Sequence, residues 1–466
     1  MQIEKDETME ITRENKMGTM KIPKLLFSIS VPIIISMLVQ ALYNIVDSIF
    51  VAQYDNVAGT GALTLAFPIQ TLMIAVATGF GVGMNALLSR SLGQKNKEKA
   101  DVVAGQGLLL TFIGYLIFLV FGLFLTGPFV ALSAEKGTRL YEYSVDYISL
   151  CTVLSLGIFM QVTCERLLQA TGKSLYSMIT QLAGAVTNLI LDPILIFGYL
   201  GAPEMGIKGA AIATVIGQFV SAIVGLVLNA AINREITLKI KNLIPKVKVL
   251  SEMLIIAIPS VVMQAIGSVM TFAMNNILLK FSEEALNVFG IYYKLQSFIF
   301  MPVFGLNNGM IPIIAYNYGA RNPDRVRATM KLSAITAIGY MLVGFAAFQL
   351  FPNTLLGLFN ASAEMLRVGA PALRTISISF MMAGFSIVSI STCQALGKSI
   401  YSLFVSIARQ IVVLIPSAYL LSLSGNVNLV WWSFPIAEVV GLTCCIIFVR
   451  KVLKDSFKNE TPAEDI

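Results

Sequence analysis

The stretch Gln169-Ala-Thr-Gly-Lys-Ser-Leu-Tyr-Ser177 recurs as Gln394-Ala-Leu-Gly-Lys-Ser-Ile-Tyr-Ser402. The two segments are identical at seven of nine positions. The register continues toward the start of each half, where Pro32 is matched by Pro259 at nearly the same separation along the chain. A nearly constant separation of this kind is the signature of an internal repeat. The chain therefore contains two copies of one structural unit.

The composition indicates which solvent surrounds these units. Of the 466 residues, 56% are hydrophobic and only 13% are charged, and the mean hydropathy is +0.78. A soluble protein carries about twice this charged fraction. Apolar stretches long enough to cross a bilayer recur from one end of the chain to the other,. The sequence therefore predicts an all-α polytopic membrane protein.

Twelve apolar stretches are predicted to be transmembrane helices, and the basic residues support this number. If the N-terminus lies in the cytoplasm, 25 of the 33 Lys and Arg residues fall in cytoplasmic segments and 5 in outer loops. Short cytoplasmic loops are enriched in these residues, and a missed helix would destroy the alternation. We therefore expect both termini in the cytoplasm. The predicted spans are residues 25–51, 62–90, 102–126, 140–164, 174–198, 207–232, 250–279, 286–316, 330–350, 366–393, 400–422 and 429–449.

The repeat and the number of spans together predict the architecture. Each copy holds six spans, and an even number leaves both copies inserted the same way up, as parallel repeats. Two such lobes with a central interface favour a transporter that binds its substrate between them. The expected parts are a cytoplasmic N-terminal tail (1–24), an N-lobe (25–232), a cytoplasmic linker (233–249), a C-lobe (250–449) and a cytoplasmic C-terminal tail (450–466). Residues 1–22 lack the features of a signal peptide, so we expect them to be a retained, mobile tail.

Missing residues argue against several other functions. The chain has no histidine, the commonest metal ligand and general base,. Gly172-Lys173-Ser174 is not a phosphate-binding loop, because Leu167 stands where such a loop needs a further glycine,. The five cysteines show no metal-site spacing and are expected to be packing residues. We expect no enzyme, no cofactor and no nucleic-acid partner, and therefore an ion gradient as the energy source.

Ionisable residues inside the N-lobe spans are the first candidates for function, because charges within a membrane are costly. Asp47 lies in the outer part of the first span, and Asn188 and Asp192 lie in the fifth. Asn188 and Asp192 are four residues apart and so share one helix face. Carboxylate and amide oxygens at this spacing predict a site for a sodium ion or a shared proton. The alternative is a structural pair that never titrates.

The C-lobe carries a different set of charges. Lys294, Arg374 and Glu438 each lie eight to ten residues in from an outer helix end. Their similar depth predicts a buried network of ion pairs, which would keep the charges tolerable, and the alternative is contact with substrate. Glu165 is expected to pair locally with Arg166. No role is assigned to Arg409.

The polar residues near Asp47 are candidates for the wall of a substrate cavity. Gln40, Tyr43 and Asn44 lie within two helical turns of Asp47,. Each of them has an equal alternative as a residue packed inward.

At Pro32, the stretch Leu42-Tyr-Asn-Ile-Val-Asp47, the segment 83–93 and the stretch Asn188-Leu-Ile-Leu-Asp-Pro-Ile194, the chain resembles the MATE (multidrug and toxic compound extrusion) family. The resemblance covers all twelve spans. The stretches Tyr292-Tyr-Lys-Leu-Gln296 and Phe434-Pro-Ile-Ala-Glu438 resemble the bacterial MepA-like branch of that family.

The resemblance implies a V-shaped, two-lobe fold in a bacterial cell membrane and export of cationic, amphiphilic drugs by antiport against protons or sodium ions. It also implies a cation site at Asp47, Asn188 and Asp192, which would be a metal site only if sodium is the coupling ion. Members that couple through the C-lobe use an acid in the seventh span, where this chain has only Glu252 at the cytoplasmic end. A C-lobe sodium site is therefore expected to be missing.

Two alternatives to multidrug export remain at this point. A flippase or exporter of a lipid-linked or endogenous metabolite would be favoured if Lys294, Arg374 and Arg409 lined the cavity. An integral membrane enzyme has no support beyond isolated acids. Because both lobes lie in one chain, a monomer is expected to suffice for transport.

Overall fold

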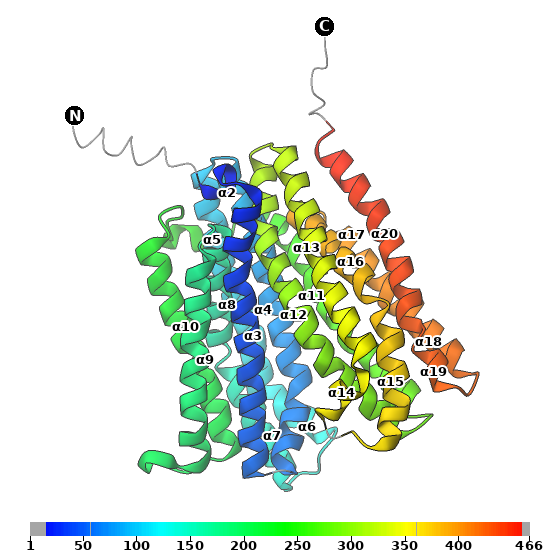
Figure 1. Ribbon diagram of the computed structural model, residues 1–466. Helices are drawn as coiled ribbons and strands as arrows, with labels where there is room; N and C mark the ends of the chain where they lie inside the picture. Colours follow the sequence, from blue (N-terminus) through cyan, green and yellow to red (C-terminus); the bar gives the residue numbers. More distant parts are fainter. Residues whose placement is uncertain (1–14, 56, 360, 459–466) are drawn as a thin grey trace, which may run out of the picture.

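The computed structural model describes residues 15–55, 57–359 and 361–458. Every regular element in these ranges is a helix, and the long helices run side by side through the molecule (Figure 1). In chain order the spans are α3 (Ile22–Tyr54), α4 (Ala58–Gly93), α5 (Lys97–Val120) continued by η1 (Phe121–Leu125) and α6 (Thr126–Ala131), α7 (Arg139–Val153) with α8 (Leu156–Ala170), α9 (Ser174–Phe197), α10 (Ile207–Ile232), α11 (Val247–Leu278), α12 (Glu283–Gly319), α13 (Pro323–Leu350), α15 (Ala363–Ser377) with α16 (Phe380–Ala395), α17 (Ser399–Ser406) continued by η4 (Ile407–Leu414) and α18 (Ile415–Ser422), and α20 (Ser433–Ser456). Among the described residues nine helices are long and apolar enough to cross a membrane, two bent pairs give two further spans, and α20 is the twelfth member of the set. The predicted twelve-span, all-α fold is confirmed.

Two of the spans are broken near their middle. The chain bends by 45° between α7 and α8, and by 47° between α15 and α16. The breaks follow residues 153 and 377, so they fall at equivalent places in the two repeats. The sequence predicts unbroken spans here, because both halves of each pair are apolar. Bending of this kind is a property of the repeated unit rather than of one lobe.

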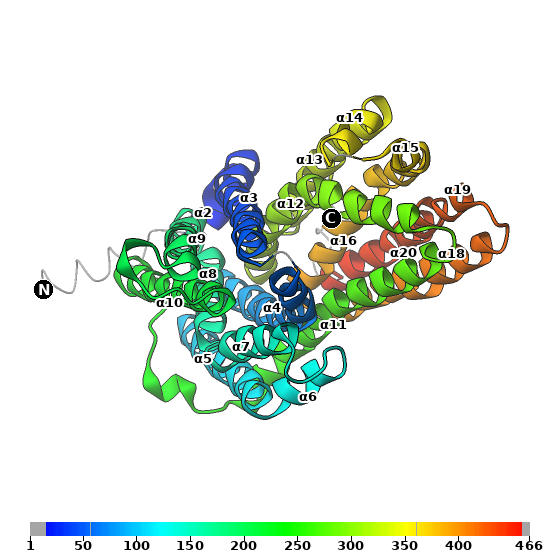
Figure 2. The ribbon, with the colours of Figure 1, turned by 90° about the horizontal axis from the view of Figure 1, so that it is seen from below.

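The helices form two groups that meet along a central seam. Figure 2 shows the N-lobe (α3–α10) on one side and the C-lobe (α11–α20) on the other, with α3 and α4 next to α12 and α11. α2 (Lys16–Thr19), the beginning of α3 and the end of α20 lie at the same end of the molecule, which we call the α2 face (Figure 1). The short helices α14 (Pro352–Gly357) and α19 (Val427–Val430) lie at the opposite face.

Glycines hold the lobes close together near the α2 face. A Cβ atom added to Gly93 would overlap the backbone carbonyl of Tyr316, and one added to Gly319 would overlap that of Arg90. Gly93 and Gly319 occupy matching positions in the two copies, so the two contacts are equivalent by the repeat. Small residues allow helices to approach this closely within a membrane. Equivalent glycines in the two lobes therefore allow the helices to pack closely across the seam.

Part of the expected mobile tail is docked between the lobes. Met17 is fully buried, and its carbonyl accepts hydrogen bonds from Asn317 Nδ2 at 3.1 Å and from Arg325 Nη2 at 2.9 Å. On the N-lobe side Met17 packs against Gly172. The expectation of a mobile tail is wrong for residues 15–22, because burial of the Met17 side chain between the two lobes holds this segment in place. Residues 1–14 lie outside the described residues.

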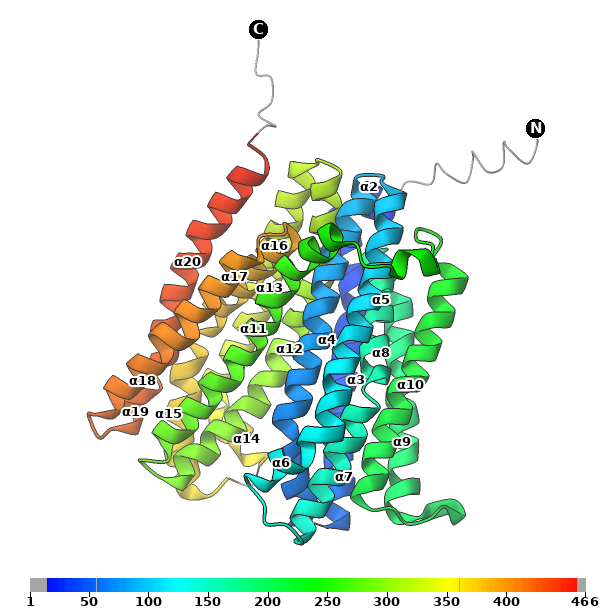
Figure 3. The same cartoon turned by 180° about the vertical axis from the view of Figure 1, so that it is seen from behind.

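The linker between the lobes is also fixed in place. Gln106 Nε2 on α5 donates to the carbonyls of Asn242 at 2.6 Å and Ile244 at 2.8 Å. Gln106 Oε1 accepts from the Lys246 amide at 3.0 Å. One glutamine thus holds η3 (Ile240–Leu243) and its neighbours against the outer side of the N-lobe (Figure 3).

Candidate functional site

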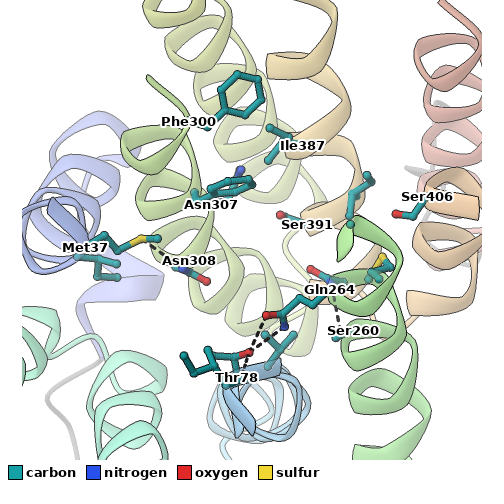
Figure 4. A pocket seen from close by; sticks show the side chains of 18 of the residues that line it. Met37, Thr78, Ser260, Gln264, Phe300, Asn307, Asn308, Ile387, Ser391 and Ser406 are labelled. Carbon is teal, nitrogen blue, oxygen red and sulfur yellow. Dashed lines mark hydrogen bonds between the residues drawn. The ribbon is translucent and has the colours of Figure 1, made fainter. Parts of the chain in front are cut away.

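A cavity of about 670 Å³ lies between the lobes. It is lined by α3, α4, α8, α9 and α10 on one side and by α11, α12, α16, η4 and α20 on the other. Figure 4 shows Met37 and Thr78 of the N-lobe around the same space as Asn307, Ile387 and Ser391 of the C-lobe. This volume suits a drug-sized molecule.

The wall of the cavity combines apolar side chains with many amides. Its methionines and phenylalanines are Met37, Met263, Met270, Phe300, Phe304 and Phe434. Its amides are Gln40, Gln161, Gln169, Gln181, Gln218, Gln264, Gln296, Gln394, Gln410, Asn307 and Asn308, and its charged residues are Glu165, Arg166, Arg409 and Glu438. Flexible apolar side chains adapt to ligands of different shape, and amides both donate and accept hydrogen bonds.

Polar contacts at two places bridge the lobes across this cavity, beside a weaker one from Asn308 Nδ2 to Met37 Sδ at 3.9 Å. Gln264 Nε2 on α11 donates to Thr78 Oγ1 on α4 at 2.8 Å (Figure 4). Arg166 Nη1 on α8 donates to Asn308 Oδ1 on α12 at 3.1 Å. Both contacts must break for the lobes to separate on this side.

Of the three residues of α3 that are predicted to line the cavity, two do so and one does not. Gln40 and Tyr43 line the cavity, and Gln40 Oε1 accepts a hydrogen bond from Gln181 at 2.8 Å. Asn44 does not line the cavity and is exposed on another side of α3. The prediction for Asn44 is therefore wrong, because one residue turns a helix by about 100°. Distance along the chain from Asp47 does not show which face a residue occupies.

The three residues of the predicted cation site come together inside the N-lobe. Asp47 is 9% exposed, Asn188 is 3% exposed and Asp192 is fully buried. Asn188 Nδ2 donates to Asp192 Oδ1 at 3.1 Å and to Thr214 Oγ1 on α10 at 3.4 Å. Asp47 lies on α3, which packs against α9. All three residues are therefore buried at or near the contact between these two helices.

Three oxygen atoms of this site have no hydrogen-bond partner among the residues that the structure describes. They are Asp47 Oδ1, Asn188 Oδ1 and Asp192 Oδ2, and all three are buried. A buried polar atom without a partner is costly, so such atoms point to an ion, a proton or a water that completes the site. Within the described ranges no group of three or more His, Cys, Asp and Glu residues resembles a metal site. The oxygen set of two carboxylates and one amide suits a hard monovalent cation or a proton.

The site lies behind the cavity wall rather than in it. None of Asp47, Asn188 and Asp192 lines the cavity, whereas Tyr43, one helical turn before Asp47, does. An event at the carboxylates can therefore reach the cavity through the packing of α3.

The predicted C-lobe network does not form. Glu438 pairs instead with Arg409, whose Nη1 lies 2.8 Å from Glu438 Oε1. Lys294 is exposed, with its Nζ 5.8 Å from the centre of the Phe359 ring. Arg374 is also exposed and donates from Nε to the carbonyl of Gln349 at 3.2 Å. The prediction matched the depth of the three charges, but α12 and α15 are rotated so that Lys294 and Arg374 point away from the cavity.

Glu165 is a cavity residue that the sequence undervalues. Its expected partner Arg166 donates instead to Gln169 Oε1 at 3.0 Å and to Asn308. Glu165 Oε1 accepts a hydrogen bond from Gln161 at 3.1 Å. Among the described residues Glu165 has no ion pair within 4.0 Å. Its position in a span was the available signal, and only the fold shows that the carboxylate faces the cavity.

A family model named MatE matches residues 32–194 and 259–420. The chain belongs to the MATE family. The two matched segments begin at Pro32 and Pro259, the prolines that are paired by the repeat. The multidrug export protein MepA of Staphylococcus haemolyticus is 26% identical over 417 residues, which cover 90% of this chain and 91% of the relative. MepA of Staphylococcus aureus strain MSSA476 is also 26% identical, over 94% of this chain and 95% of the relative.

Solved structures show the same fold. One is described as the outward-facing conformation of a multidrug resistance MATE family transporter, with a TM-score of 0.88, 24% identity and coverage of 96% of this chain and 99% of the other. Another is a MOP superfamily transporter from Pyrococcus furiosus, with a TM-score of 0.88, 23% identity and coverage of 97% and 99%. The MATE, MepA-like identity and the fold predicted from the sequence are confirmed.

Proposed function

We propose that this protein exports cationic, amphiphilic compounds in exchange for protons or sodium ions. The observation that carries the proposal is the group of three unpartnered, buried oxygens at Asp47, Asn188 and Asp192, one helical turn from the wall of a drug-sized cavity. Coupling requires that the ion and the drug prefer different conformations. The proposed cation site and the cavity wall share α3, so a movement of α3 can give the ion and the drug different preferred conformations.

Glu165 is the residue we assign to the positive charge of the drug. Its carboxylate faces the cavity without an ion pair, and the surrounding methionine and phenylalanine side chains supply apolar contact. Of the described cationic residues of the wall, Arg166 is hydrogen-bonded to Gln169 and the charge of Arg409 is balanced by its ion pair with Glu438. Lys294 and Arg374 lie outside the wall. The carboxylate of Glu165, which has no ion pair among the described residues, therefore favours a cationic drug over an anionic lipid-linked metabolite.

The ion and the lobes are connected through α3. We infer that the α2 face is cytoplasmic, because the basic loops lie at that end, and that the protein resides in the cell membrane as a monomer. A proton or sodium ion arriving from the opposite face neutralises one of the two negative charges of the Asp47 and Asp192 pair. The packing of α3 against α9 then changes, and with it the position of Tyr43 and Gln40 in the cavity wall. Drug release to the outside follows from this change of the wall.

Efflux of a fluorescent lipophilic cation from cells tests the proposal. At matched expression, Asp47→Asn should lose ion-driven efflux that the wild type shows. The matched control is Asp55→Asn at the end of the same helix, because Asp55 Oδ1 accepts from the Val57 and Ala58 amides and an asparagine keeps that oxygen. Equal efflux by the wild type and Asp47→Asn would contradict N-lobe coupling.

Membrane vesicles with an imposed proton or sodium gradient identify the ion. The gradient of the coupling ion should drive uptake into inverted vesicles, and the other gradient should not. Uptake of a lipid-linked anion in place of the cation would instead support a metabolite exporter.

The role of Glu165 is tested separately. Glu165→Gln should weaken binding of a monocationic dye to the purified protein by about tenfold, the loss expected for one charge-assisted contact. A neutral dye of similar shape should bind the variant and the wild type alike. Equal weakening for both dyes would indicate a structural role for Glu165.

A further inference from the structure

We propose that Arg409 and Glu438 form a subsite that binds zwitterionic substrates, with Arg409 taking the substrate's carboxylate and Glu438 its positive charge. The inference rests on the proposed export function and adds a substrate class and two residues that recognise it. It concerns the C-lobe wall, apart from both Glu165 and the N-lobe cation site.

The ion pair leaves hydrogen-bonding capacity free on both residues. Arg409 Nη1 donates to Glu438 Oε1 at 2.8 Å, and this is the hydrogen bond that the described residues give Arg409. Glu438 Oε2 is buried without a partner. The side chains are only 17% and 13% exposed, yet both line the cavity. A ligand in the cavity can therefore reach the free N–H groups of Arg409, and the unsatisfied Glu438 Oε2 lies enclosed just behind that part of the wall.

The local backbone places Arg409 at the cavity. Arg409 lies in η4, a π-helical segment, and such segments are frequent at functional sites,. Gly441 on α20 lets the aliphatic part of Arg409 lie against that helix, since an added Cβ would come within 3.0 Å of Arg409 Cδ. The guanidinium is thereby held next to Glu438, three residues before Gly441 on the same helix.

Stability alone does not account for the pair. A buried ion pair contributes little net stability compared with apolar side chains of similar size. In the register that pairs Gln394 with Gln169, the position of Arg409 corresponds to Gly184 in the N-lobe. Gly184 packs closely against Gly217 and Ser221. The shared scaffold therefore holds together without a charge at this position, and the charges are an addition of the C-lobe.

The neighbouring side chains suit a cationic ring system. Three aromatic side chains line the cavity nearby: Tyr292 and Tyr293 on α12, and Phe434 on α20, the helix that carries Glu438. Tyr292 and Phe434 lie edge to face, with ring centres 6.0 Å apart. Aromatic faces attract cations. They give the positive end of a substrate an apolar surface next to the carboxylate of Glu438.

The pairing of opposite charges selects the class of ligand. A ligand with one positive charge that approaches Glu438 also meets the guanidinium of Arg409, and a monoanion meets the carboxylate. A zwitterion places each of its charges beside the opposite charge and forms two charge-assisted contacts at once. A zwitterion is therefore the ligand that this wall complements best.

Two dyes that differ in one group make the test. Rhodamine B carries a delocalised positive charge and a carboxylate, and its ethyl ester keeps the positive charge but lacks the negative one. Binding of each dye to the purified protein in detergent is followed by fluorescence polarisation. The variants are Arg409→Met and Arg409→Lys, with Lys294→Met as the control, because Lys294 is a C-lobe cation outside the cavity.

For Arg409→Met we expect about tenfold weaker binding of rhodamine B and unchanged or tighter binding of the ester, because the guanidinium that opposes a cation at Glu438 is gone. Arg409→Lys should restore most of the rhodamine B affinity, and Lys294→Met should bind both dyes as the wild type does. If Arg409→Met does not fold, the double variant Arg409→Met/Glu438→Met removes both charges together and should bind the two dyes with the same affinity.

Two results would overturn the subsite. One is wild-type protein that binds the ester but not rhodamine B, which would leave cation export intact. The other is an equal loss of both dyes in Arg409→Met and in the double variant. A wild type that binds neither dye would contradict the proposed export function as well.

Discussion

The two lobes share one scaffold and carry different chemistry. In the N-lobe two carboxylates and an amide leave three oxygens unpartnered behind the cavity wall. In the C-lobe a carboxylate in the wall is paired with an arginine at 2.8 Å. The N-lobe group contains no cationic side chain, whereas the C-lobe pair contains Arg409. Repetition thus supplied the framework, and each lobe acquired its own polar site.

The seam between the lobes shows the opposite behaviour. Gly93 and Gly319 make equivalent contacts with the backbone of the other lobe. Backbone approach depends on the shape of the helices, which the repeat preserves. Charge depends on single side chains, which can change without altering that shape.

The largest effect should come from removing an N-lobe carboxylate. Asp192→Asn is expected to reduce ion-driven export by up to about 100-fold, because the variant can no longer link ion binding to the conformational change. Glu438→Gln should leave the dependence on the ion gradient unchanged. Transport of a lipophilic cation into vesicles, with and without the gradient, measures both. Loss of gradient dependence in Glu438→Gln would place coupling in the C-lobe.

The next effect concerns the symmetrical seam. Gly93→Ala and Gly319→Ala should each destabilise the closed α2 face by about 1–3 kcal/mol, the usual cost of overpacking, because neither Cβ fits beside the opposing carbonyl. Thermal unfolding of the purified variants measures this. Gly290→Ala on α12 is the control, since nothing lies within 4 Å of its added Cβ. A large difference between Gly93→Ala and Gly319→Ala would break the equivalence of the two contacts.

A third prediction addresses α2, for which the described part of the C-lobe has no counterpart. Met17→Ala should cost about 2 kcal/mol, because a fully buried side chain is truncated,. Thr19→Ala, at an exposed position of the same helix, should change the melting temperature little. Proteolysis near residue 20 should become faster only in Met17→Ala. Unchanged stability and cleavage would mean that α2 does not seal the seam.

The smallest effects should come from the two cations that point away from the cavity. Lys294→Met and Arg374→Met are expected to change drug efflux by less than about twofold, as for most exposed positions without buried partners. Efflux of the same lipophilic cation measures this at matched expression. A strong loss in either variant would return that residue to the substrate path.

Much of the candidate site was open to prediction, and the failures share one cause. Asn188 and Asp192 were assigned together because their spacing of four puts them on one helix face whatever surrounds it. The prediction for Asn44 was wrong because whether this residue faces the cavity depends on how α3 is rotated about its axis. The predictions for Lys294 and Arg374 were wrong for the same reason on α12 and α15. The importance of Glu165 was underestimated because Arg166, its expected partner, contacts Asn308 of the other lobe instead.

By itself the sequence determined the membrane setting, the twelve spans, the parallel repeat and the shared helix face of Asn188 and Asp192. These follow from hydrophobicity, charge in the loops and spacing along one helix, which are local properties of the chain. Only the tertiary structure decided that Arg409 pairs with Glu438, that Met17 fills the seam and that Glu165 faces the cavity. Depth in the membrane is linear along a span, whereas the direction in which a side chain points is set by packing against helices far away in the chain.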